Sequence, residues 1–101
     1  MPALIRILAV AAIAWVSPVM AADSDYLAAR EAFRTGNDAA LAKAYRQLSD
    51  SPLQVYAEFW QLWRRLKLPD ASADVEHFLA KEKGSYLAEK LRMEWLKQLA
   101  K

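Results

Sequence analysis

Residues 54–66 of the chain, QVYAEFWQLWRRL, are the stretch that decides the fold. Apolar side chains at helical spacing cover most of the circumference of this segment, namely Val55, Tyr56, Phe59, Trp60, Leu62, Trp63 and Leu66. The polar side chains form one stripe, Gln54, Glu58, Gln61 and Arg65, with Arg64 beside it near the end. A helix that is apolar on nearly every side is buried on more than one side. We therefore expect this helix to lie between its neighbours, as in a layered helical array.

The sequence from Ala22 onward is rich in helix-forming residues. Alanine occurs 14 times there, isoleucine is missing, and the β-branched residues are limited to Thr35, Val55 and Val75. β-Strands favour β-branched side chains, whereas Ala, Leu, Lys, Arg, Glu and Gln lose little side-chain freedom in a helix. The composition therefore predicts an all-α fold.

Capping and helix-breaking residues divide this region into about five short helices. The first is predicted to run from near Asp25 to Thr35, with Ser24 as its N-cap and Gly36 in the left-handed position after its last turn. The second follows Asn37, and one of its faces presents apolar side chains at positions i, i+3, i+4 and i+7. These residues are Leu41, Ala44, Tyr45 and Leu48.

The remaining three helices are placed by Pro, Ser and Gly. The third is predicted to start at Ser51 and Pro52, since proline suits a first helical turn, and to end at about Leu66. The fourth begins after Ser72 and stops at Gly84, and the fifth follows directly from Ser85. The expected inward residues are Val75, Phe78 and Leu79 in the fourth helix and Leu87, Leu91, Trp95 and Leu99 in the fifth. Connections of a few residues favour antiparallel packing as αα-hairpins.

The start of the chain has the layout of a secretory signal peptide. Residues 1–6 include one basic side chain, and residues 7–16 form an unbroken apolar run. Pro18 interrupts this region, whereas a membrane span requires roughly 20 apolar residues. We therefore predict cleavage between Ala21 and Ala22, no stable membrane span, and a periplasmic or secreted product.

Residues 22–101 are expected to form a single small domain, because 80 residues allow no more. The chain has no cysteine and one histidine, His77, which excludes thiol nucleophiles, zinc ribbons and multi-histidine metal sites. Its 14 Lys and Arg residues are nearly balanced by 12 Asp and Glu residues, which argues against nucleic-acid binding. No cofactor and no metal are predicted.

Catalytic motifs are also missing from the sequence. There is no Gly-rich phosphate loop, nucleophile elbow or paired-acid motif. The helix carboxylates that one might consider, Glu58, Glu89 and Glu94, have no partner that the sequence places nearby. No catalytic residue is therefore predicted.

Tyr56, Trp60 and Trp63 allow two interpretations. Apolar aromatic faces pack well on the C–H surfaces of sugar rings, so these side chains would suit a carbohydrate-binding platform. An aromatic stripe at helical spacing is more often part of a hydrophobic core. Both interpretations remain open at this point.

The remaining polar features have simple structural interpretations. His77 precedes Phe78 on a face next to the expected core, where a surface or structural role is usual. Arg64, Arg65 and Lys67 form a short basic cluster that would suit an acidic polymer. A solvated face near a helix C-terminus, where cations interact well with the helix dipole, is the simpler interpretation.

Several short stretches resemble the start of the soluble lytic murein transglycosylases. They are YLAAREAF at 26–33, GND at 36–38, SPL at 51–53 and YAEFW at 56–60. The closing stretches, FL at 78–79, GSYLAEKLR at 84–92 and WL at 95–96, are similar to a pattern that closes one helix pair and opens the next in that family. The resemblance covers essentially all of the expected mature chain.

This resemblance implies a periplasmic protein of peptidoglycan remodelling. Family members cleave the glycan strand between N-acetylmuramic acid and N-acetylglucosamine without water, leaving a 1,6-anhydro-muramic end. Their N-terminal half is a U-shaped superhelix of short helices, and a C-terminal lysozyme-like domain holds the single catalytic glutamate. Residues 22–101 correspond to the first helices of the superhelix and lack the catalytic domain. Peptidoglycan, the rest of the superhelix and the catalytic domain are the implied partners.

Two hypotheses follow for the function. In the first, the chain is the non-catalytic N-terminal part of a lytic transglycosylase and is inactive by itself. Burial of apolar surface by 80 residues contributes about 120 kcal/mol, and ordering them costs about the same, so this length is marginal as an independent domain. In the second, it is a small stand-alone periplasmic helical module that binds peptidoglycan or a partner protein through its aromatic-rich third helix.

Overall fold

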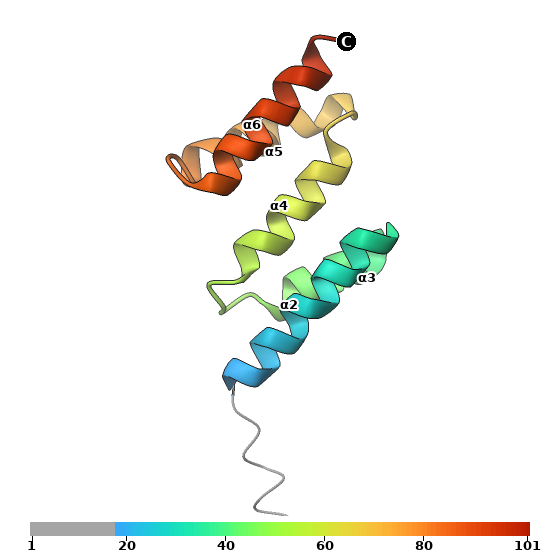
Figure 1. The fold of residues 1–101 in the computed structure, drawn as a ribbon, viewed down its shortest axis with the longest axis vertical. Coiled ribbons are helices and arrows are strands. Elements are labelled where there is room, and N and C mark those ends of the chain that lie inside the picture. Colours follow the sequence, from blue (N-terminus) through green and yellow to red (C-terminus); the bar gives the residue numbers. More distant parts are fainter. Residues whose placement is uncertain (1–17) are drawn as a thin grey trace, which may run out of the picture.

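The computed structural model describes residues 18–101, which fold into five α-helices and one short 3₁₀-helix (Figure 1). The elements are α2 (Pro18–Thr35), α3 (Asp38–Gln47), α4 (Gln54–Arg65), η1 (Pro69–Ala71), α5 (Ser72–Lys81) and α6 (Tyr86–Leu99). Residues 18–101 contain no β-strand, which confirms the all-α prediction. Within the same residues, no helix combines the length and apolarity that a bilayer crossing requires.

The turn between α2 and α3 is the one that the sequence predicts. Gly36 has a φ of 74°, a conformation in which glycine avoids the steric penalty of a Cβ atom. Its N–H donates to the carbonyl of Phe33, and the N–H of Asn37 donates to the carbonyl of Ala32, which is the Schellman pattern. The Asn37 side chain then accepts a hydrogen bond from the N–H of Ala40, 3.1 Å away, and so caps α3. This turn confirms the predicted left-handed position of Gly36 and the predicted start of the second helix after Asn37.

The predicted start of the first helix is wrong. Helix α2 begins at Pro18, so Ser24 lies inside the helix rather than at its N-cap. Proline suits a first helical turn, and the residues that follow it contain two alanines and no helix breaker. The predicted cleavage bond between Ala21 and Ala22 therefore lies within α2. The expected basic and apolar parts of the signal peptide lie outside the described residues.

Two other boundaries differ by a few residues from those predicted. Ser51, Pro52 and Leu53 form a turn before α4, in which the Ser51 hydroxyl accepts a hydrogen bond from the Leu53 N–H at 3.1 Å. Pro52 therefore precedes the helix instead of lying in its first turn. Helix α5 ends before Gly84, because a further turn lies between the two. Helix α6 begins directly after Ser85 as predicted, and the Ser85 hydroxyl caps it by accepting a hydrogen bond from the Ala88 N–H at 3.1 Å.

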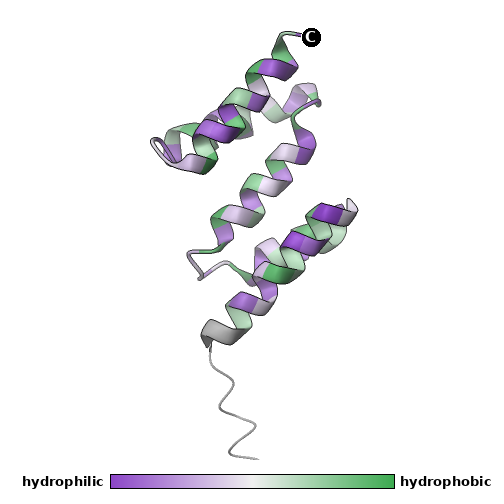
Figure 2. Cartoon of the chain, viewed as in Figure 1, coloured by the Kyte–Doolittle hydropathy of each residue, from purple (hydrophilic) through white to green (hydrophobic). Residues whose placement is uncertain are grey.

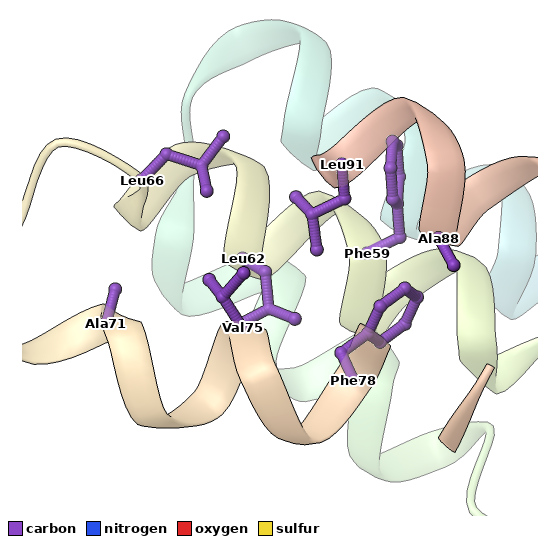
Figure 3. Packing of buried hydrophobic residues seen from close by; sticks show 8 residues of the cluster. All are labelled: Phe59, Leu62, Leu66, Ala71, Val75, Phe78, Ala88 and Leu91. Carbon is purple, nitrogen blue, oxygen red and sulfur yellow. The ribbon is translucent and has the colours of Figure 1, made fainter. Parts of the chain in front are cut away.

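Two groups of buried side chains hold the helices together. The first, here called the alanine cluster, joins α2, α3 and the start of α4 and consists of Ala29, Ala32, Leu41, Ala44, Leu48 and Ala57. The second, here called the phenylalanine cluster, joins α4, η1, α5 and α6 (Figure 3). It consists of Phe59, Leu62, Leu66, Ala71, Val75, Phe78, Ala88 and Leu91.

Helix α4 is shared by both clusters. It contributes Ala57 to the alanine cluster and Phe59 to the phenylalanine cluster, and Trp60 packs against both. In Figure 1, α4 lies between α2 and α3 on one side and α5 and α6 on the other. This arrangement confirms that the helix with the apolar circumference lies between its neighbours.

The predicted inward faces are correct except at one residue. The buried residues include Leu41, Ala44 and Leu48 of α3, Val75 and Phe78 of α5, and Leu91 of α6. Leu99 is the exception, because 61% of its surface is exposed. The last turn of α6 projects beyond α4 in Figure 1, so Leu99 has little to pack against. Apolar and polar residues are interleaved along the outer surface of this helix (Figure 2).

Candidate functional site

Four aromatic side chains from α2 and α4 form one group, here called the aromatic cluster. It consists of Tyr26, Phe33, Tyr56 and Trp60. The Trp60 ring stacks on Phe33 with a centroid distance of 5.7 Å and an interplanar angle of 17°. The Tyr26 ring meets that of Tyr56 edge-on at 5.4 Å. The cluster combines core packing with exposure, since Trp60 is half-buried and Tyr56 is 37% exposed.

The structure separates Trp63 from the other two predicted aromatics. Trp63 lies against Phe59, with centroids 5.6 Å apart, and packs on the phenylalanine cluster. The ammonium of Lys90 lies 5.8 Å from the Trp63 ring centroid, a distance at which a cation is attracted by the ring face. Tyr56 and Trp60 are therefore brought together in the aromatic cluster, whereas Trp63 lies outside it.

Tyr26 and Phe33 contact Trp60, and neither was predicted as a site residue from the sequence. A signal for them exists, because these two residues are seven positions apart on α2 and so lie on the same side of the helix. Phe33 and Trp60 also line a surface hollow of about 620 Å³, here called the aromatic hollow. The other residues of its wall are Leu27, Arg30, Glu31 and Arg34.

Charged groups occupy one side of the aromatic hollow. The Arg34 Nε donates to a Glu31 carboxylate oxygen at 2.9 Å. This hydrogen bond from Arg34 lowers the pKa of Glu31 and raises that of Arg34. The wall thus places an aromatic surface next to hydrogen-bonding groups of both charges. This combination suits a cyclic ligand that has one apolar face and polar substituents at its edge.

A second hollow, here called the polar cleft, lies where α3, α4 and α5 meet. It has a volume of about 250 Å³ and is lined by Tyr45, Glu58, Gln61, Leu62, Arg65, Asp74 and His77. Lys81 reaches one end, where its ammonium donates to both oxygens of Glu58 at 2.8 and 2.6 Å. At the other end the Arg65 Nη1 donates to Asp74 at 3.0 Å. The polar stripe of α4 therefore faces a cleft.

The two ion pairs of the polar cleft reflect the relative direction of α4 and α5. Glu58 near the start of α4 meets Lys81 at the end of α5, and Arg65 at the end of α4 meets Asp74 near the start of α5. The two helices therefore run in opposite directions along this contact. The sequence contains a signal for this pairing, because each helix has an acidic residue followed seven positions later by a basic one. These residues are Glu58 and Arg65 in α4, and Asp74 and Lys81 in α5.

The basic cluster at the end of α4 does not form one surface. Arg64 pairs with Asp38 of α3, whereas Arg65 turns to Asp74 of α5. The hydrogen bond from Arg64 lowers the pKa of Asp38, and the same bond raises the pKa of Arg64. Lys67 is exposed beyond the helix end. The arrangement links α4 to both of its neighbours and leaves no concentrated basic patch here.

The three helix carboxylates considered in the sequence all have basic neighbours. Glu58 pairs with Lys81, Glu89 with Arg92, and Glu94 lies 3.7 Å from the Lys97 ammonium. His77 is exposed at the wall of the polar cleft. Within residues 18–101 no group of three or more His, Cys, Asp or Glu side chains is arranged to hold a metal ion. Each of the three carboxylates therefore takes part in an ion pair.

Comparison with known proteins finds no relative. No protein-family model, no curated protein and no solved structure matches the chain.

Proposed function

We propose that residues 22–101 form the first helices of the superhelical domain of a periplasmic lytic transglycosylase, which acts in peptidoglycan cleavage and cell-wall turnover. In this proposal the segment is not catalytic and shapes the start of the larger domain. The order of the family-like stretches is the observation that carries the proposal.

The position of these stretches in the fold supports the proposal. Gly36 and Asn37 make the turn between α2 and α3, Asp38 begins α3, and residues 51–53 lie in the connection between α3 and α4. Residues 84–92 contain the cap and the first turns of α6. The matching residues thus include the turns that set how successive helices are joined, as well as parts of their apolar faces.

The outer face of α6 also supports a continuing array of helices. Large side chains remain exposed on it, with Tyr86 at 74%, Met93 at 62% and Leu96 at 55%. Exposed apolar side chains gathered on one helix indicate a surface that another element covers. In the proposed parent protein, the next helices of the superhelix pack on this face.

The intact mass of the native protein tests this proposal. An antibody raised against residues 22–101 is used to recover the product from a periplasmic extract of the source organism. We expect a species several times heavier than residues 22–101, and that species should release anhydro-muropeptides from sacculi. Recovery of a species with only the mass of residues 22–101 would overturn the proposal.

The aromatic cluster favours a second candidate, a stand-alone periplasmic module that binds peptidoglycan. The aromatic hollow places Trp60 and Phe33 beside Arg30, Glu31 and Arg34. Amino-sugar rings have apolar faces, and the muramic acid of peptidoglycan also bears a carboxylate that an arginine binds well. Such a site would hold a glycan strand without cleaving it.

Retention on purified sacculi tests the second candidate. Trp60 packs against both buried clusters, so the exposed Arg30 and Arg34, which line the aromatic hollow, are the better residues to change. We expect the double variant R30Q/R34Q to lose most of its retention, because it removes the guanidinium partners of the muramic carboxylate. The variant R92Q/K97Q on α6 removes the same charge away from the hollow and should keep its retention. Equal retention of these two folded variants, or no retention of the unaltered chain above an inert protein, would exclude this candidate.

A further inference from the structure

Charged groups of both signs stand at each end of the polar cleft. The Glu58 and Lys81 pair occupies one end, and the Arg65 and Asp74 pair occupies the other. Glu58 and Arg65 are seven residues apart on α4, which corresponds to about 10.5 Å along a helix axis. A ligand lying along the cleft therefore meets a carboxylate and a guanidinium at this separation.

Polar side chains outside the two ion pairs line the middle of the cleft. Gln61 of α4 and His77 of α5 lie between the two ion pairs, and Tyr45 reaches the cleft from α3. Within residues 18–101 none of these three side chains takes part in a hydrogen bond to another protein group. Buried Leu62 lies beneath them. The cleft thus offers both donors and acceptors along its length.

The end groups retain capacity for a ligand. Arg65 uses one of its five N–H groups on Asp74, and Glu58 accepts two of the roughly four hydrogen bonds that a carboxylate can accept. The side chain of Lys81 is 42% exposed and that of Asp74 is 59% exposed. Ion pairs with such exposure are weak in water, so both pairs can rearrange at little cost.

We propose that the polar cleft binds a short zwitterionic peptide, with its terminal ammonium on Glu58 and its terminal carboxylate on Arg65. An extended chain spans about 3.3–3.6 Å per residue, so about three residues match the separation of the two end groups. The carboxylate is assigned to Arg65 because a guanidinium binds it with two parallel hydrogen bonds. The ammonium is assigned to Glu58 because its side chain, at 19% exposure, is the more buried of the two carboxylates.

The peptide amide groups lie along the middle of the cleft in this arrangement. Gln61, His77 and Tyr45 supply hydrogen bonds to them, which gives affinity for a peptide backbone with little preference for its side chains. The proposal depends on α3, α4 and α5 alone and is independent of the proposed function. Its failure would leave the transglycosylase assignment untouched, and the reverse is also true.

Titration with tri-alanine, followed by the amide resonances of the protein, tests the proposal on the unaltered chain. We expect shifts in α4 and α5 with a dissociation constant of about 0.1 to 1 mM. N-acetyl-tri-alanine lacks the ammonium and tri-alanine amide lacks the carboxylate, so each should bind about tenfold more weakly. Equal binding of free and blocked peptides, or no shift in α4 and α5 at millimolar tri-alanine, would overturn the proposal.

Two variants assign the ends of the ligand. E58Q should weaken tri-alanine about tenfold but change the binding of N-acetyl-tri-alanine little, because the group that Glu58 contacts is already missing. R65Q should show the same pattern with tri-alanine amide. R92Q removes a basic member of the exposed α6 pair, outside the cleft, and should bind as the unaltered chain does. Unchanged tri-alanine binding by E58Q and R65Q, with circular dichroism showing both folded, would overturn the assignment.

Discussion

The alanine cluster and the phenylalanine cluster hold helices together in different ways. Four of the six residues in the alanine cluster are alanines, so little apolar area is buried per residue, but no side-chain entropy is lost. The phenylalanine cluster includes two phenylalanines and three leucines, which bury far more apolar surface. We infer that larger side chains do not fit in the alanine cluster, because its helices lie close together. The phenylalanine cluster instead stabilises the fold through the apolar area that its large side chains bury.

The largest expected effect comes from truncation in the phenylalanine cluster. Phe78 is fully buried, and its ring lies 6.4 Å from that of Phe59. We expect F78A to lower the free energy of unfolding by about 3–5 kcal/mol through lost burial and a residual cavity. Urea titration followed by tryptophan fluorescence measures this, with Y86A as an exposed aromatic control. A loss below about 1 kcal/mol would contradict the role given to this cluster.

Enlargement in the alanine cluster should have a smaller but clear effect. Ala29 is fully buried between helices, whereas the adjacent Ala28 is exposed on the same helix. We expect A29L to destabilise the protein by about 1–3 kcal/mol through overpacking, and A28L to change stability by less than about 0.5 kcal/mol. Thermal unfolding of both variants makes the comparison. Equal stability of A29L and A28L would show that the alanine cluster has spare room.

The two glycine turns allow a matched comparison between the regions. Gly36 connects α2 to α3 with φ of 74°, and Gly84 precedes α6 with φ of 86°. We expect G36A and G84A each to cost about 1–2 kcal/mol, because both place a Cβ in the left-handed region. The nearest atom to a Cβ at Gly36 is an Arg64 nitrogen at 3.4 Å, which is ordinary contact, so the two costs should be similar. A far larger loss for G36A in urea titration would show that Arg64 holds this turn rigidly.

The smallest expected effect is that of acid on the link between α3 and α4. The hydrogen bond from Arg64 holds the pKa of Asp38 below its ordinary value of 3.8. Ionised Asp38 therefore adds stability above pH 3.8, and this contribution is lost as the pH falls through the lowered pKa. We expect the unaltered chain to be slightly more stable than D38N at neutral pH, with the difference vanishing in acid. A constant difference between the two across this pH range would contradict the assignment.

Features set by neighbouring residues could be predicted from the sequence. The left-handed position of Gly36 and the helix starts after Asn37 and Ser85 depend on the local backbone, and each is where the pattern places it. Ser24 shows the limit of such patterns, because a residue that suits an N-cap is also tolerated inside a helix. The helix continues through it because nothing upstream as far as Pro18 ends the helix.

The candidate sites depend on contacts between distant residues and were harder to predict. Glu58 and Lys81 are 23 positions apart, and their pairing requires knowing that α4 and α5 run in opposite directions. Trp60 and Trp63 are three residues apart, which separates them by about 60° around a helix. That angle is enough to place Trp63 on the phenylalanine cluster, away from Tyr56 and Tyr26.

Helix α2 continues through Ala21 and Ala22, which bears on whether the predicted signal peptide could be cleaved before or after the helix folds. Peptide groups inside a helix are held by hydrogen bonds within the helix, so a protease reaches this bond only in a chain whose first turn is unwound. The predicted cleavage at this bond, if it occurs, would therefore have to precede the folding of α2. It would leave a helix beginning at Ala22, with Asp23 and Asp25 in its new first turn, where negative charge favours the positive end of the helix dipole. Removal of the predicted leader would then shorten α2 and place acidic side chains at its N-terminus, where they stabilise the helix.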